Sequence, residues 1–127
     1  MELWDLNSRD WNPHRPEILS SAQDGRAITL DLPAGEMLQD HQVHEGAWIA
    51  IIRGDVTITS ETGQTVEAEA EAGILLHLPP QERHEVKART DARLLLILTP
   101  WPGVGHPGTM TLQEKADVRS RAAGRAD

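Results

Sequence analysis

The stretch DVTITSETGQTVEAEAEA, residues 55–72, carries the clearest structural signal in this sequence. Apolar and polar residues alternate from Val56 to Ser60 and again from Thr65 onward, and the polar tetrapeptide ETGQ separates the two runs. Side chains on a β-strand alternate between its two faces, so each run predicts a strand with one buried face. The stretch therefore predicts β-structure with a turn, and we expect a strand over the whole of residues 65–72.

Similar runs occur along most of the chain. They cover residues 17–21, 27–32, 42–52, 73–78, 84–88 and 92–99. The last run is apolar enough to predict burial on both faces, and the tripeptide RGD at residues 53–55 predicts a tight hairpin turn. Strands spaced by roughly 8 to 12 residues, with turn residues between many of them, predict an all-β sandwich or barrel.

The chain divides into three parts by composition. Residues 1–16 are polar and contain two prolines, which predicts an extended N-terminal arm, anchored by Trp4 or Trp11. Residues 17–100 carry the strand pattern and form the expected antiparallel barrel. Residues 101–127 begin with a Pro/Gly-rich exit segment and end in a polar tail.

The C-terminal part contains one helix signal. Thr111 to Glu114 reads T-x-x-E, a capping box that predicts a short helix starting at Leu112. The apolar stripe that follows is weak, so a tail without helix is the alternative.

Composition restricts the possible partners. The chain has 127 residues, 20 acidic against 12 basic, and a formal net charge of −8, which argues against nucleic acid or an anionic membrane surface. Cysteine is absent, so disulfides and thiolate ligands are excluded. Phe and Tyr are also absent, so the core must be built from Leu, Ile, Val and Ala. The N-terminus lacks the pattern of a signal peptide, and we expect a cytoplasmic protein.

Two sets of residues have the spacing of a known family. They are Gly35, His41 and Gly54 in the first set, and Gly73, Pro79 and His84 in the second. This spacing resembles the cupin family, whose motifs read G-x5-H-x-H-x3,4-E-x6-G and G-x5-P-x-G-x2-H-x3-N. The resemblance covers about residues 19–99 and implies a small jelly-roll barrel with a metal ion bound inside it.

The sequence departs from both motifs at defined positions. Val43 replaces the second histidine, Ala47 or Trp48 replaces the glutamate, Gln81 replaces the second glycine and Ala88 replaces the asparagine. The resemblance therefore carries over only His41 and His84 from the four metal ligands of the family.

His44 lies one residue beyond the second histidine position of the motif. Residues i and i+3 of a regular strand face opposite sides, so His41 and His44 share a face only if a β-bulge intervenes, for which Gly46 is a candidate. With a bulge, His41, His44 and His84, with water or Glu45, form a site for Zn²⁺, Fe²⁺, Mn²⁺ or Ni²⁺. A regular strand instead leaves two inward histidines and weak or no metal binding.

His77 and Trp48 are the candidate ligand-binding residues. His77 shares a strand face with Leu75 and Pro79. On an interior face it would serve as a metal ligand or acid–base group, and on an outer face it would contact solvent or a dimer partner. Trp48 is either a hydrophobic wall for a small ligand or a core or interface residue.

Two classes of function remain open. In the first, a divalent metal activates water or O₂, or polarises a substrate, for which the resemblance implies a small organic acid or sugar-like molecule. In the second, the barrel is a binding or sensor module without catalysis. We also expect a homodimer, because a small barrel has sheet edges to protect and the resemblance implies pairing.

Overall fold

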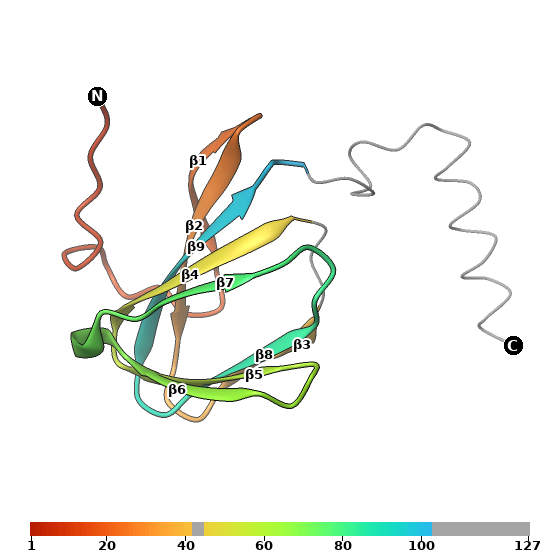
Figure 1. Cartoon of the computed structure of the whole chain (residues 1–127). Coiled ribbons are helices and arrows are strands. Elements are labelled where there is room, and N and C mark those ends of the chain that lie inside the picture. The colour runs from red at the N-terminus through yellow and green to blue at the C-terminus, as the bar shows by residue number, and fades with distance from the viewer. Residues whose placement is uncertain (42–44, 103–127) are drawn as a thin grey trace, which may run out of the picture.

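Two antiparallel β-sheets packed face to face make up the fold (Figure 1). The structure is a computed structural model that describes residues 1–41 and 45–102, with the backbone alone described for residues 39–41. The five-stranded sheet has the order β1-β2-β9-β4-β7, and the four-stranded sheet has the order β3-β8-β5-β6. The strands are β1 (Glu17–Ala22), β2 (Gly25–Leu32), β3 (Met37–His41), β4 (Gly46–Arg53), β5 (Asp55–Ser60), β6 (Thr65–Glu69), β7 (Leu75–Leu78), β8 (His84–Ala88) and β9 (Ala92–Thr99). The prediction of an all-β antiparallel jelly roll is confirmed.

The core fills the space between the two sheets. Inward side chains alternate with outward ones along each strand, as in β4, where Ala47, Ile49 and Ile51 are buried. The buried hydrophobic residues described are Leu, Ile, Val and Ala, as the composition predicts. Each fully buried Leu, Ile or Val side chain contributes about 1.5–3 kcal/mol to folding, so the two-sheet core is the main stabilising feature.

The turn at Gly54 joins the two sheets. Gly54 has φ +79°, and a Cβ added there would lie 2.2 Å from the Asp91 carbonyl oxygen, so only glycine fits. The prediction of a hairpin was wrong, because β4 and β5 belong to different sheets. Both edges of β4 are already paired, with β7 and β9, and the chain must therefore cross to the other sheet.

Three further segments differ from the sequence pattern. The alternating run at residues 65–72 ends as a strand at Glu69 and continues as a short 3-10 helix, Ala70–Ala72, closed by Gly73 in the left-handed conformation. Strand β3 was not predicted. The second half of β9 is not buried on both faces, since Ile97 is 36% exposed on the outer side.

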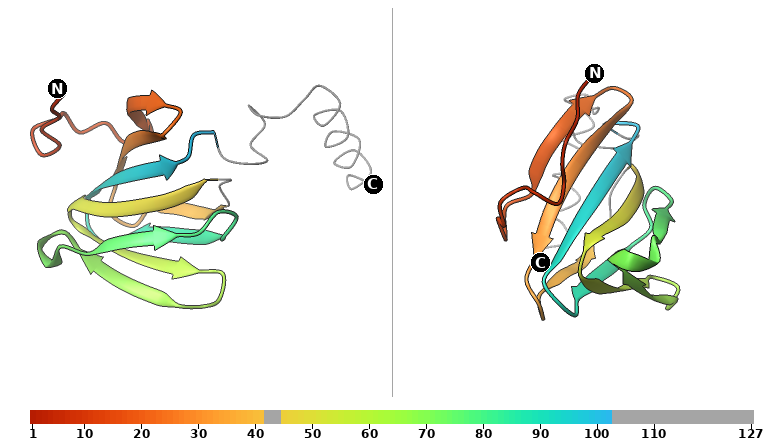
Figure 2. Two further views of the ribbon diagram at one scale, coloured as in Figure 1. Left: turned by 45° about the horizontal axis from the view of Figure 1, so that its top comes forward. Right: turned by 90° about the vertical axis from the view of Figure 1, so that its left-hand side faces the viewer.

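The N-terminal arm crosses the outer side of the five-stranded sheet (Figure 2) and is held there by Arg93. Arg93 Nη1 donates to the carbonyl oxygens of Leu6 and Arg9 at 2.7 and 3.0 Å, and Nη2 donates to that of Asp10 at 3.0 Å. Arg93 Nε and Nη2 donate to the two carboxylate oxygens of Asp31 at 2.6 and 2.9 Å. All five N–H groups of the guanidinium therefore have an acceptor.

Two further hydrogen bonds hold the arm. Arg53 Nη2 donates to the Asn7 carbonyl oxygen at 2.9 Å, and the Asn12 amide donates to Asp31 Oδ2 at 2.8 Å. Trp4 and Trp11 are both exposed. The arm is thus held through its backbone, which hydrogen-bonds to side chains of the sheet. The sequence predicted an anchor at Trp4 or Trp11 and did not predict these backbone contacts.

Candidate functional site

His41 and His84 lie directly opposite each other in the pairing of β3 with β8. The register shifts between the Leu38–Val86 pair and the His41–His84 pair, so β3 contains one extra residue, a β-bulge. In a regular ladder, Asp40 would stand opposite His84. The bulge therefore brings together the two histidines of the cupin-like pattern, at the Cα separation of about 4.5–5.5 Å typical of paired residues.

His84 is held on the inner face of the four-stranded sheet. It is 2% exposed, and it pairs with His41 on one side and with Ser60 of β5 on the other. Its Nδ1 lies 3.4 Å from the Glu82 carbonyl oxygen. When Nδ1 donates to this carbonyl, the lone pair of the ring is on Nε2, the arrangement usual for a metal-binding histidine.

The chain after His41 contributes a buried carboxylate. Glu45 is 2% exposed, although the sequence gives it no apolar neighbour on either side. A bulge lies before His41, and from Gly46 onward β4 pairs regularly with β9 as far as Ile51. The segment between His41 and His44, where the sequence predicts a bulge, lies outside the described residues. His44 lies outside the described residues.

The side chains of His84 and Glu45 offer part of the donor set that a divalent metal ion needs. Imidazole nitrogen and carboxylate oxygen suit Zn²⁺, Fe²⁺, Mn²⁺ and Ni²⁺, and His84 and Glu45 are both withdrawn from solvent. Among the side chains that the structure describes, those of residues 1–38 and 45–102, no group of three His, Asp or Glu is placed to hold an ion. A complete donor set therefore requires the side chain of His41 or His44.

A hollow of about 230 Å³ is lined in part by Ser60, the β5 residue that pairs with His84. It lies between the edge strands β6 and β7 and is lined by Ile58, Ser60, Gln64, Val66, Leu76, His77, Leu78 and Glu82. Sequence reasoning missed Ser60 and Gln64. Only the pairing of β5 with β8 brings Ser60 opposite His84, and the Ser60 amide donates to the Gln64 carbonyl oxygen at 2.9 Å.

Trp48 and His77 lie on the outer face of the five-stranded sheet. They are direct partners in the β4–β7 pairing, and their ring centroids are 4.4 Å apart. Trp48 is 39% exposed, and its neighbours Ala47 and Ile49 face the core. Of the two placements considered for His77, the structure supports the outer one, although His77 also borders the rim of the hollow.

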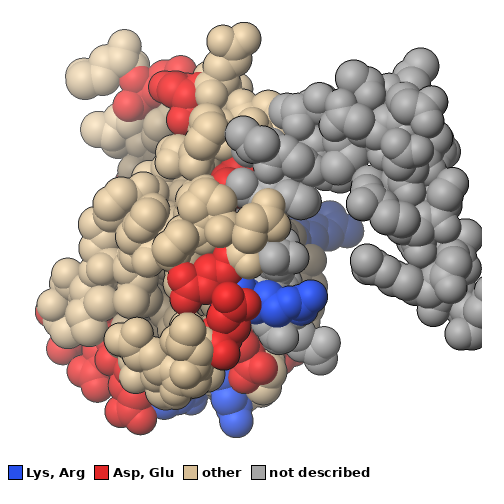
Figure 3. All heavy atoms as spheres, turned by 45° about the vertical axis from the view of Figure 1, so that its right-hand side comes forward, with Lys and Arg blue, Asp and Glu red and all other residues tan. Residues whose placement is uncertain are grey.

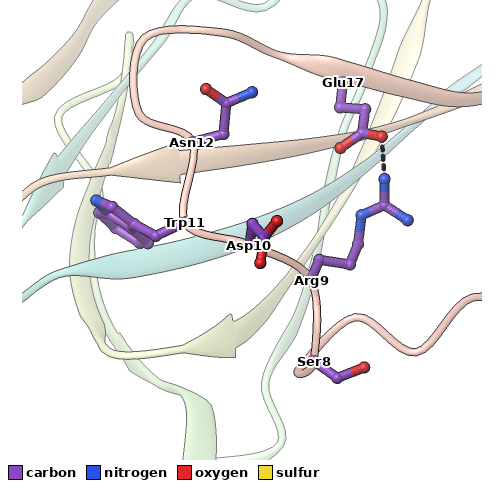
Figure 4. A pocket seen from close by; sticks show the side chains of 6 residues that line it. All are labelled: Ser8, Arg9, Asp10, Trp11, Asn12 and Glu17. Atoms are coloured by element: carbon purple, nitrogen blue, oxygen red, sulfur yellow. Dashed lines mark hydrogen bonds and ion pairs between the residues drawn. The ribbon is translucent and has the colours of Figure 1, made fainter.

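A larger hollow of about 560 Å³ lies beside the N-terminal arm (Figure 4). Ser8, Arg9, Asp10, Trp11, Asn12 and Glu17 line it, and Arg9 and Glu17 form an ion pair across it. We place the candidate site at the smaller hollow, because its lining residue Ser60 is the direct strand partner of the buried His84.

Comparisons with known proteins support the fold. No protein-family model and no curated protein matches this sequence. Among solved structures, an RmlC-like cupin from Desulfovibrio desulfuricans is 19% identical with a TM-score of 0.69, over 79% of this chain and 97% of that chain. An RmlC-like cupin with a double-stranded β-helix fold from Methanocaldococcus jannaschii is 16% identical with a TM-score of 0.67, over 80% and 93%. The chain therefore has the cupin fold.

A protein with a double-stranded β-helix domain from Klebsiella pneumoniae has the same architecture. It is 13% identical, with a TM-score of 0.68 over 81% of this chain and 93% of that chain. In the part of the chain that the structure describes, no helix has the length and apolar character needed to cross a membrane.

Proposed function

We propose that this protein binds a small organic molecule inside the cupin fold, beside a divalent metal ion held by His41 and His84. The observation that carries the proposal is the direct pairing of these two histidines across β3 and β8, with His84 buried. His84 is a buried titratable side chain whose β5 partner, Ser60, lines a hollow, and this arrangement supports a binding role.

Each described residue has a definite part in this proposal. His84 supplies a ring nitrogen whose tautomer is set by the Glu82 carbonyl. Glu45 offers a carboxylate out of contact with solvent, as a further ligand or as a hydrogen-bond acceptor. The apolar side chains of the hollow exclude water around the bound molecule. When bound, the metal would polarise an oxygen of the ligand or lower the pKa of a bound water.

A metal-free binding module is the second candidate. It is favoured by the absence of a three-donor group among the residues that the structure describes. In that case His84 and Glu45 act as hydrogen-bonding groups for the ligand, and no reaction follows.

We also propose that the protein is a homodimer, formed through the outer face of the five-stranded sheet. Trp48, Leu75 and Ile97 are exposed large apolar residues on this face. Exposed apolar side chains gathered on one sheet face are typical of an interface, and a two-fold axis would place the same patch on both sides.

Metal analysis tests the proposed site. Purified protein, loaded separately with Zn²⁺, Fe²⁺, Mn²⁺ or Ni²⁺ and dialysed, should retain about one ion per chain, and His84→Ala and His41→Ala should retain none. His14→Ala is the matched control, since His14 is exposed and pairs with Glu36 at the surface. A bound ion must also raise the melting temperature of the wild type by mass action. Equal metal content in wild type and all three variants would overturn the proposal.

A further inference from the structure

The hollow beside His84 opens at a free edge of the fold. Strand β7 is the last strand of the five-stranded sheet and β6 is the last of the four-stranded sheet. The two strands do not pair, so the chamber between them is accessible from the side. A molecule can therefore reach the neighbourhood of His84 without any displacement of the core.

The lining of this chamber divides into an apolar wall and a polar end. The inward side chains of Ile58, Val66, Leu76 and Leu78 make the wall. Ser60, Gln64 and Glu82 make the polar end, and His77 lies at the rim. A volume of 230 Å³ corresponds to about seven or eight water molecules at roughly 30 Å³ each, which suits a ligand of only a few carbon atoms.

The charge at the polar end decides which ligands fit. Among the described lining residues, Glu82 is the one carboxylic acid and His77 is the one imidazole, and Glu82 is half-buried. Glu61 lies next to this end, where its Oε2 accepts a hydrogen bond from the Arg83 amide at 3.3 Å. Arg83 itself is exposed and is not among the lining residues.

The wider surface acts in the same direction. Figure 3 shows Asp and Glu side chains at several places on one face, with a Lys or Arg side chain beside the central acidic group, and the chain has a formal net charge of −8. An anionic ligand would meet like charge during approach and again in the chamber, where partial burial weakens the screening by water.

We propose that the chamber takes a small ligand with an apolar body and a hydrogen-bond-donating end, an alcohol or an amine, and discriminates against carboxylates. Ser60, Gln64 and Glu82 all offer oxygen acceptors to such a donor. Ser60 and Gln64 can also donate, but a Glu82 carboxylate can only accept. In the metal-free chamber a ligand carboxylate therefore makes no hydrogen bond with it and is repelled by its charge, which lowers the affinity. This inference rests on the proposed function, since it names the ligand class of the same site.

Three probes with one carbon skeleton test the ligand class. Butan-1-ol, butylamine and butyrate are titrated in a buffer containing EDTA, and binding is followed by the amide NMR shifts of Ser60 and Gln64. We expect butan-1-ol and butylamine to shift these amides, and butyrate to bind about tenfold or more weakly. Ten-fold corresponds to about 1.4 kcal/mol, the size of one unfavourable charge contact in a partly solvated site.

Two variants test whether the charge of Glu82 causes the discrimination against butyrate and whether the probes bind in the chamber. Glu82→Gln keeps the size of the side chain and removes its charge, so butyrate should bind to this variant as well as butan-1-ol does. Val66→Trp should fill the chamber and abolish the shifts for all three probes, with a native amide spectrum as proof of folding. Butyrate binding to the wild type as tightly as butylamine, selectivity unchanged in Glu82→Gln, or no binding of any probe would each overturn the inference.

The test of the ligand class and the test of the metal site can fail independently. A wild type that binds butan-1-ol but retains no metal ion would overturn the metal proposal alone. Retention of metal without binding of butan-1-ol or butylamine would overturn the ligand class alone.

Discussion

Arg93 of β9 and Asp31 of β2 are direct partners on the outer face of the five-stranded sheet and are 1% and 6% exposed. The N-terminal arm covers this pair and supplies three carbonyl acceptors to Arg93. Removing one partner of a buried ion pair leaves an uncompensated charge at a cost of about 3–5 kcal/mol. We therefore expect Arg93→Leu and Asp31→Asn each to lower the free energy of unfolding by about that amount, measured by urea denaturation.

Arg53→Ala is the control for this prediction. Arg53 is exposed and gives the arm a single hydrogen bond, to the Asn7 carbonyl oxygen. Its loss should cost about 1 kcal/mol or less. Equal losses in the Arg53 and Arg93 variants would contradict the view that Arg93 is the anchor of the arm.

The same ion pair predicts an acid-sensitive stability. Burial alone would raise the pKa of Asp31, but hydrogen bonds from Arg93 and the Asn12 amide, with the charges of Arg93 and Arg53, outweigh it and lower that pKa. The unfolded chain then binds the proton more readily than the folded chain, so this contribution is fully present above about pH 4 and is lost as the pH falls through the folded value. Urea titrations from pH 6 to pH 2 should show a steeper acid loss in the wild type than in Asp31→Asn. Parallel curves would contradict it.

Gly54 predicts a localised steric requirement. Alanine at this position must adopt φ near +79° and places Cβ 2.2 Å from the Asp91 carbonyl oxygen. Gly63 is the matched control, with φ +87° and no atom within 4 Å of its added Cβ. Gly63→Ala should cost about 1–2 kcal/mol from the left-handed backbone alone. Gly54→Ala should cost clearly more, and equal melting temperatures for the two variants would show that the contact with Asp91 relaxes freely.

The outer apolar face predicts a change in assembly. Light scattering after size exclusion should give the wild type twice the 14.0 kDa mass of one chain. Trp48→Asp, which puts a charge in the centre of the apolar patch, should give a mass near 14.0 kDa with the core intact. Lys87→Ala, on the outer face of the other sheet, should leave the mass unchanged. A wild type that elutes as a monomer would refute the proposed dimer.

Most strands followed from local pattern, and the exceptions have local causes. The alternation at Val56 to Ser60 identified β5, because residues two apart share a face whatever the strand pairs with. The continuous apolar run at Ala92 to Thr99 identified β9. Strand β3 was missed because its five residues show no strict alternation and contain a bulge. The spacing of the glycines, the proline and the two histidines was sufficient to identify a cupin-like pattern.

The candidate site was predicted only in part. The sequence singled out His41 and His84, but it could not place them opposite each other, because a regular β3 would have brought Asp40 to that position. It considered an interior place for His77, whereas the β4–β7 register puts this residue beside Trp48 on the outer face.

The sequence by itself determined the all-β class, most of the strands, an aliphatic core and the spacing that singled out His41 and His84. Only the tertiary structure decided which strands pair, where the bulge falls, that Arg93 binds the backbone of the arm, and that Ser60 and Glu82 share a chamber beside His84. The physical reason is the distance along the chain over which each feature is set. Alternation of polarity involves neighbouring residues, whereas sheet order and register depend on contacts between segments far apart in the chain.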